Sequence, residues 1–330
     1  MISRRQLLLA PLLLTACGGR NEPKTRPLFA ADTHPDEYPT VQALHAIDRL
    51  LNERTNGEMR VRIYAGGQMG AEKDTLEITV FGGLDLNRVN LAPLNSIVPE
   101  TIVLALPFLF RSIPHLRATL DGTTGRKILD AMSAQGLHGL CYYDSGARSF
   151  YNTRRPIRTP EDMKGLKLRV QNSDIYVAMV SALGANPTPI PYGEVYQSLV
   201  QGVVDGAENN WPSYESARHF EAAQHYSLTR HVMAPEVLVA SERRWDRMSY
   251  EEQEYLQAAA YDSVPIMREI WDARVNAARA RLIESGVQVV DDIDRDAFAK
   301  LMLPVWDQFL TDPKIRALAD EIVALEVADE

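Results

Sequence analysis

Two arginines in apolar or aromatic surroundings are the residues of this sequence best suited to bind a small molecule. Arg169 lies in KGLKLRVQ (164–171), where a strand would turn it to the face opposite Leu168. Arg148 lies in DSGARSFYN (144–152), at the end of a predicted strand. A guanidinium offers paired donors that match a carboxylate, so each arginine could hold an organic anion. The alternative is an ordinary salt bridge, which is favoured for an arginine taken at random in so acidic a chain.

Signatures of catalysis are missing from the sequence. The motifs Gly-x-Ser-x-Gly, His-Glu-x-x-His and Gly-x-Gly-x-x-Gly do not occur. His219, His225 and His231 are six residues apart, a spacing that on a helix turns successive rings to different faces rather than toward one metal. Cys141 lies in an apolar segment with no base nearby, which predicts a small buried side chain. We therefore expect no enzyme, no metal site and no cofactor.

The composition is that of a globular protein of about two domains. The chain has 330 residues, of which 45% are apolar and 24% charged, and this excludes disordered, collagen-like and coiled-coil proteins. Its 35 basic and 44 acidic residues give a net charge of −9, which argues against nucleic acid as a partner. Two cysteines are too few for a disulfide scaffold.

The N-terminus predicts export from the cytoplasm. Residues 1–16 combine Arg4 and Arg5 with an apolar run too short to span a membrane, which is typical of a signal peptide. The run ends in LTAC, which resembles a lipobox, so we expect lipidation at Cys17 and a polar tether over 17–27. The alternative is an ordinary signal peptide with a chance cysteine. Both indicate the periplasm, with or without a membrane anchor, and a mature net charge of −11.

Strand-like and helix-like segments alternate along the remaining chain. This alternation predicts an α/β fold with parallel or mixed sheets and helices on both faces. Residues 251–284 have a helical pattern interrupted at Pro265, which fits one kinked helix or two shorter ones. Further helices are expected at 39–55, 71–82, 175–183 and 193–201, and strands at 59–65, 84–91, 139–143 and 166–170.

The sequence resembles the periplasmic solute-binding proteins of TRAP transporters, the DctP-like family. The resemblance covers residues 28 to 320, in family order, and its motifs are specific in combination. They are GGQMGAE (66–72), LPFLF (106–110), TPEDMKGLKLRV (159–170), GANPTPIPYGEVY (184–196) and GVVDGAENN (202–210).

This resemblance implies a two-lobed fold of mixed sheets that closes on a carboxylated solute. It assigns residues 28–147 plus 233–272 to lobe I and residues 148–232 plus 273–330 to lobe II, joined by hinge strands. It also implies one long helix spanning both lobes, which favours a single kinked helix. The implied partners are a small carboxylate and the membrane permease subunits of a TRAP transporter, with the binding protein a monomer.

The resemblance also implies roles for individual residues. In the family, positions matching Arg169, Arg148 and Asn209 bind the ligand carboxylate. Glu72 and Asn90 lie where relatives place polar groups for ligand hydroxyls, although relatives of the sialic-acid type carry an acid at the second position. The remaining expected contacts are an aromatic wall at Tyr192, polar groups at Gln171, Asn210 and His34, and sugar stacking by Trp211, with Tyr214 as a further stacking candidate.

Among family members, the sequence looks most like the binders of uronic acids. The polar residues around the expected site favour a hexuronate such as glucuronate or galacturonate. The alternatives are sialic acid, an aldonate, a C4-dicarboxylate or a keto acid. A periplasmic sugar-acid enzyme is a further alternative, with Glu72 or His34 as its base. Structural roles also stay open: Trp211 in the core, His34 in a surface loop and Gln171 at a strand edge.

Overall fold

The computed structural model describes residues 26–327 of the chain. The predicted signal peptide (1–16), Cys17 and most of the tether (17–27) lie outside these residues. Within them, no helix is both long and apolar enough to cross a membrane.

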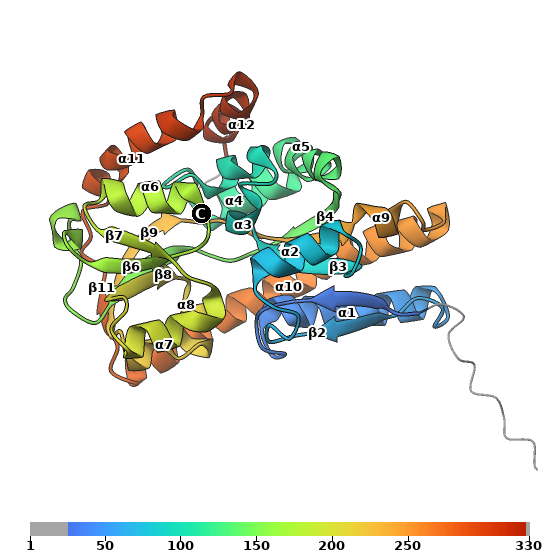
Figure 1. Cartoon of the computed structure of the whole chain (residues 1–330), viewed down its shortest axis with the longest axis horizontal. Coiled ribbons are helices and arrows are strands. Elements are labelled where there is room, and N and C mark those ends of the chain that lie inside the picture. Colours follow the sequence, from blue (N-terminus) through green and yellow to red (C-terminus); the bar gives the residue numbers. More distant parts are fainter. Residues whose placement is uncertain (1–25, 328–330) are drawn as a thin grey trace, which may run out of the picture.

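The first of two mixed β-sheets has five strands in the order β2-β1-β3-β10-β4 (Figure 1). Strands β1, β2 and β3 are parallel, whereas β10 is antiparallel to both β3 and β4. We call the part of the molecule built on this sheet lobe I. The strands are β1 (Leu28–Ala31), β2 (Val61–Tyr64), β3 (Leu86–Asn90), β4 (Leu137–Tyr143) and β10 (Glu236–Ser241).

The second sheet has six strands in the order β11-β9-β5-β8-β6-β7 and forms the basis of lobe II. Strand β5 is antiparallel to β8 and β9, whereas β6 is parallel to β7 and β8. The strands are β5 (Arg148–Asn152), β6 (Lys167–Val170), β7 (Asn186–Pro189), β8 (Gly206–Asn209), β9 (His225–Val232) and β11 (Gln288–Val290).

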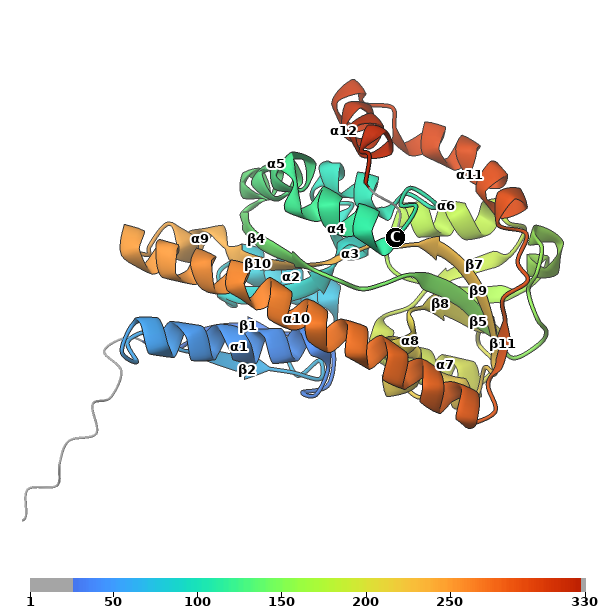
Figure 2. The ribbon, with the colours of Figure 1, turned by 180° about the vertical axis from the view of Figure 1, so that it is seen from behind.

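The chain crosses between the lobes several times, as expected of a protein without a linker. It crosses between β4 and β5, between β9 and β10, and along helix α10 (Tyr250–Glu284). Figure 2 shows α10 in front, running diagonally across both sheets. The helix is continuous through Pro265, which confirms the single-helix interpretation. A capping box of Ser249 and Glu252 fixes its N-terminus.

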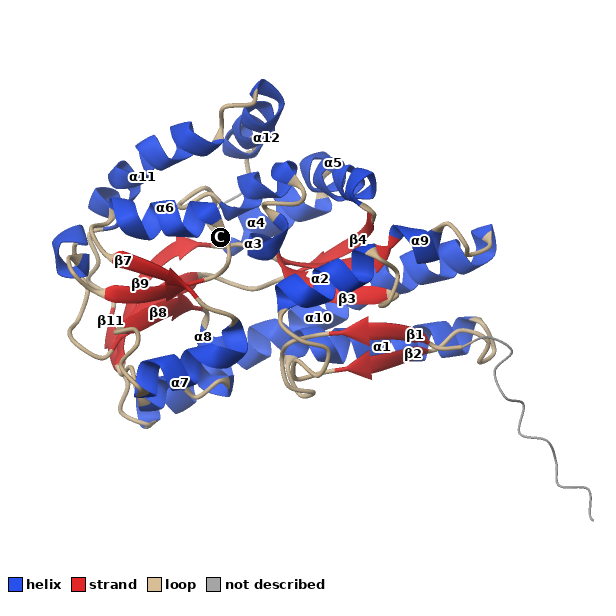
Figure 3. Cartoon of the chain, in the orientation of Figure 1, coloured by secondary structure: helices blue, strands red, loops and turns tan. Residues whose placement is uncertain are grey.

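Helices lie on both faces of the sheets, as the alternating sequence predicts (Figure 3). Helix α11 packs against α6, while α12 packs against α5 and the 3₁₀ helix η1 (Pro99–Ala105). The helices are α1 (Pro39–Arg54), α2 (Glu72–Val80), α3 (Leu91–Leu94), α4 (Ile113–Asp121), α5 (Thr123–Ala131), α6 (Asp174–Ala182), α7 (Val195–Val200), α8 (Trp211–Ser216), α9 (Glu242–Trp245), α11 (Arg295–Phe309) and α12 (Pro313–Ala324).

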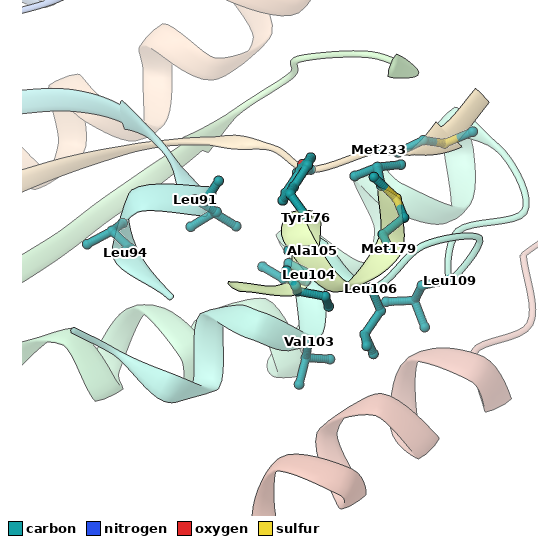
Figure 4. Close-up of a cluster of buried hydrophobic side chains, with 14 of the residues drawn as sticks. Leu91, Leu94, Val103, Leu104, Ala105, Leu106, Leu109, Tyr176, Met179 and Met233 are labelled. Carbon is teal, nitrogen blue, oxygen red and sulfur yellow. The ribbon is translucent and has the colours of Figure 1, made fainter. Parts of the chain in front are cut away.

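The apolar core confirms the helical periodicity read from the sequence. In α1, the predicted apolar face is fully buried at Val41, Leu44 and Ile47. The largest cluster extends from lobe I into lobe II, with η1 packed beside α6 (Figure 4). Cys141 is buried, and burial raises the pKa of its thiol to about 12, so it is a small core residue as expected.

Candidate functional site

A cavity of about 300 Å³ lies between the two lobes. Its lobe I wall comes from the loops after β1 and β2, the start of α2, and Pro93. Its lobe II wall comes from the end of β6 and from residues 190–194. Four of the ten predicted ligand contacts line it: Glu72, Arg169, Gln171 and Tyr192.

Arg169 is a buried cation without a carboxylate partner among residues 26–327. Strand alternation places Leu168 in the core and turns Arg169 to the cavity, where its side chain is only 2% exposed. Its Nε donates to the carbonyl of Ile190 at 2.8 Å, and its buried Nη1 has no hydrogen-bond partner. Burial lowers the pKa of Arg169. The guanidinium therefore has unmet capacity for an anion.

Arg148, by contrast, already has an acidic partner. The chain places it at the start of β5, where Glu208 of the neighbouring strand β8 accepts from Nε at 2.5 Å and from Nη2 at 2.8 Å. Burial opposes the charged guanidinium, but Glu208 outweighs this effect and holds the pKa of Arg148 above its ordinary value. Its Nη1 donates to Oδ1 of Asn209 at 2.9 Å.

Asn209 is the last residue of β8, and only the oxygen of its side-chain amide is hydrogen-bonded within the described residues. Its Oδ1 accepts from Arg148 and from the backbone N–H of Asn210 at 2.9 Å. Its Nδ2 donates no hydrogen bond to any other described residue. The amide is therefore oriented by Arg148, with its donor end available.

Sequence reasoning missed a second buried arginine on the lobe I side. Arg88 of β3 is 0% exposed and contacts three carboxylates. Asp32 accepts from Nε at 2.8 Å, whereas Glu72 and Glu236 accept from Nη1 at 2.9 and 2.6 Å. Burial raises the pKa of Glu72, whereas the attraction of Arg88 lowers those of Asp32 and Glu236 despite their burial. One cation thus faces three acidic groups.

The other lobe I candidates are held by this network. Glu72 also accepts from the backbone N–H of Asn90 at 3.1 Å, and Asn90 itself caps α3 and donates to Glu236 at 3.2 Å. His34 is buried rather than in an exposed loop, with its Nδ1 2.7 Å from Nη2 of Arg88. Its ring stacks on Tyr38 at 3.8 Å between centroids.

On lobe II, two candidates lie at the cavity wall. Gln171 has a buried Oε1 without a hydrogen-bond partner in the described part of the chain. Tyr192 donates to the carbonyl of Ser213 at 3.2 Å, and its ring lies 5.2 Å from that of His34 in lobe I.

The last three candidates form hydrogen bonds or ring contacts with other residues of the protein. Asn210 caps α8 by accepting from Ser213 N–H at 2.8 Å and donates to the carbonyl of Ser145 at 2.9 Å. Trp211 stacks on Tyr226 at 4.1 Å and lines a different pocket, beside α10. Tyr214 is fully buried and donates to a backbone carbonyl.

Direct contacts join the lobes around the cavity. The Tyr38 hydroxyl lies 2.8 Å from Oγ of Ser213, and Ser173 donates to Oδ1 of Asn95 at 2.7 Å. The first pair joins the start of α1 to α8, and the second joins α6 to the loop after α3. The lobes are therefore closed on each other at two places.

Known proteins share this architecture. The family model "bacterial extracellular solute-binding protein, family 7" (DctP) matches residues 30–312. A TRAP periplasmic solute-binding protein from Bradyrhizobium sp. BTAi1, solved in complex with α/β-D-galacturonate, is 50% identical with a TM-score of 0.90. One from Xanthobacter autotrophicus Py2 with β-D-galacturonate is 47% identical, with a TM-score of 0.89. One from Roseobacter denitrificans with β-D-glucuronate is 39% identical, with a TM-score of 0.89. Each match covers 91% of this chain and 100% of the other. This chain therefore belongs to the DctP family, the periplasmic solute-binding proteins of TRAP transporters.

Proposed function

We propose that this protein captures a hexuronate and delivers it to its transporter. Relatives of 39% to 50% identity were solved with galacturonate or glucuronate bound. The two at 47% and 50% hold galacturonate, which makes galacturonate the first ligand to test.

The observation that carries this proposal is the unpaired guanidinium of Arg169. Arg88 and Arg148 are equally buried, but each contacts at least one carboxylate of the protein itself. Arg169 has none among the described residues, and its Nη1 is buried without a partner. A ligand carboxylate would supply the missing negative charge, and lobe closure would strengthen the pair by excluding water.

The charges of lobe I favour a ligand with hydroxyl groups rather than a second carboxylate. Arg88 is outnumbered by Asp32, Glu72 and Glu236, so this cluster offers acceptors and disfavours an anion beside it, although Lys73 also lines the wall. A sugar acid has one carboxylate for Arg169 and several hydroxyl donors for the opposite wall. A C4-dicarboxylate would place its second charge near these acids.

The proposed contacts follow from which polar groups remain available. Asn209 Nδ2 joins Arg169 at the carboxylate, and Arg148 orients Asn209. We exclude Asn210 and Trp211 because both are committed to internal contacts. His34 and Asn90 support the acidic wall. The direct contacts proposed are Arg169, Asn209, Gln171, Tyr192 and Glu72.

The remaining features of the proposal concern the protein in its cell. We propose a non-catalytic monomer whose closed form docks on the permease subunits. Its lobes comprise 28–147 with 233–272, and 148–232 with the chain from 273 onward, although α12 packs on elements of lobe I. Lipidation at Cys17 would tether it to the membrane.

Calorimetric titration tests the proposal. We expect galacturonate and glucuronate to bind, and galactose, succinate and pyruvate to bind much more weakly or not at all. Mass spectrometry of the recovered sugar should show it unchanged. Binding of succinate in preference to both uronates would overturn the ligand assignment, and a chemically altered sugar would overturn the assignment as a pure binding protein.

A further inference from the structure

Tyr176 differs from the other buried tyrosines of this protein. Seven tyrosines are buried within residues 26–327. Six of them form a hydrogen bond through the hydroxyl: Tyr38, Tyr142, Tyr143, Tyr151, Tyr214 and Tyr226. The hydroxyl of Tyr176 is buried and has no partner among the described residues. A buried hydroxyl without a partner is unfavourable, so its presence calls for a partner absent from the protein itself.

The ring of Tyr176 packs among apolar side chains, whereas its hydroxyl is surrounded by charged residues. The side chain extends from α6 into an apolar cluster that includes Leu91, Met179 and Met233 (Figure 4). Burial raises the pKa of the hydroxyl, and the charges around it also act on that pKa. These charges belong to both lobes: Arg148, Glu208, Glu236 and Arg169. Tyr176 does not itself line the cavity, but its hydroxyl shares the charged surroundings of Arg169 and remains protonated at neutral pH.

Three donors in this region lack an acceptor within the described part of the chain. They are Nη1 of Arg169, Nδ2 of Asn209 and the hydroxyl of Tyr176. A carboxylate has two oxygens and about four lone-pair positions, enough for all three donors. Because Glu208 already balances Arg148, Arg169 supplies one uncompensated positive charge. A neutral O–H adds a hydrogen bond without adding a charge, which suits a single carboxylate.

We propose that Tyr176 is a specificity-determining residue that donates its hydroxyl proton to the ligand carboxylate. This inference rests on the proposed function, because it assumes a carboxylated ligand in this cavity. Together with Arg169, the Tyr176 hydroxyl would favour a sugar acid over a neutral sugar, because a neutral sugar offers these donors no anionic acceptor.

The variant Tyr176→Phe tests this role, because it removes one oxygen and keeps the ring in its apolar cluster. We expect galacturonate affinity to fall roughly 10- to 100-fold, as for loss of a hydrogen bond to a charged group. The melting temperature of the ligand-free variant should not fall, since the hydroxyl has no partner among residues 26–327. Tyr142→Phe is the matched control, because its hydroxyl donates to the Gly125 carbonyl at 3.0 Å. That variant should bind normally and melt at a lower temperature.

Two results would overturn the role of Tyr176. One is wild-type affinity in Tyr176→Phe, and the other is a melting temperature lowered as much as in Tyr142→Phe, which would indicate a structural hydroxyl. If the wild-type protein binds no uronate, the proposed function is wrong, and the same variants are then tested with whichever monocarboxylate binds in a screen. If it binds no carboxylate at all, both proposals are overturned.

Discussion

Arg148 lies side-on against Glu208, with Nε and Nη2 each bonded to one carboxylate oxygen in a fully buried pair. Both residues project from neighbouring antiparallel strands, β5 and β8. Nη2 of Arg148 also donates to the backbone carbonyl of Glu208 at 3.0 Å, and Nη1 orients Asn209. Arg148 therefore positions Asn209 in this structure, whereas Arg169 has no carboxylate partner among the described residues.

Removing one member of this pair should destabilise the protein. Arg148→Met leaves Glu208 buried without its guanidinium partner, with the His231 ring 3.7 Å away, and we expect a loss of about 3–5 kcal/mol in the free energy of unfolding. The double variant Arg148→Met/Glu208→Gln should regain much of that loss, because no charge is left unpaired. Urea denaturation measures both. Equal stability of the single and double variants would show that the pair contributes little.

Acid should weaken the protein through the same pair. Burial alone would raise the pKa of Glu208, but Arg148 and, after it, His231 outweigh burial and lower the pKa to about 2. The unfolded chain has a glutamate pKa of about 4.3, so the folded state binds this proton less readily. The stabilisation is present above pH ~4.3 and is lost as the pH falls toward 2.

The urea midpoint should therefore decrease between pH ~5 and ~2. The urea midpoint of the double variant Arg148→Met/Glu208→Gln should decrease less steeply over this pH range. The remaining decrease would come from other carboxyl groups such as Asp32, whose pKa is also lowered. Identical pH profiles for the two proteins would contradict the assignment to Glu208.

The contact between Tyr38 and Ser213 should slow ligand release. Tyr38→Phe removes the hydrogen bond between the lobes but keeps the ring on His34. We expect galacturonate to dissociate about 2- to 10-fold faster, the effect of one neutral hydrogen bond. Stopped-flow fluorescence measures the rate, with the 75% exposed Tyr250 changed to Phe as control. An unchanged rate would mean that this contact does not hold the lobes closed.

The sequence predicts the fold better than the site. Period-two alternation places Arg169 on the face opposite Leu168, and the structure agrees. Arg88 was missed because all five residues of β3 are buried, so alternation carries no signal there. Its partners Asp32, Glu72 and Glu236 are distant in sequence, and only tertiary structure unites them.

The aromatic residues were also ambiguous in sequence. Trp211 was expected to stack on a sugar; in the structure its ring stacks on Tyr226, and the sugar contact stays an untested prediction. An aromatic residue beside a motif can face either the ligand or the core, and the choice depends on packing from other strands. Tyr176 gave no signal at all, because its significance lies in the absence of a partner among the described residues.

The most direct test is a calorimetric titration of the wild-type protein and Arg169→Gln with galacturonate. We predict binding to the wild type and a loss of at least 100-fold in the variant, because the ligand carboxylate loses the only buried Lys or Arg without a carboxylate partner among the described residues. The variant should be no less stable than the wild type, since a buried uncompensated charge is removed. The exposed Arg279→Gln serves as the control. Galacturonate binding of wild-type strength by Arg169→Gln would contradict the central claim.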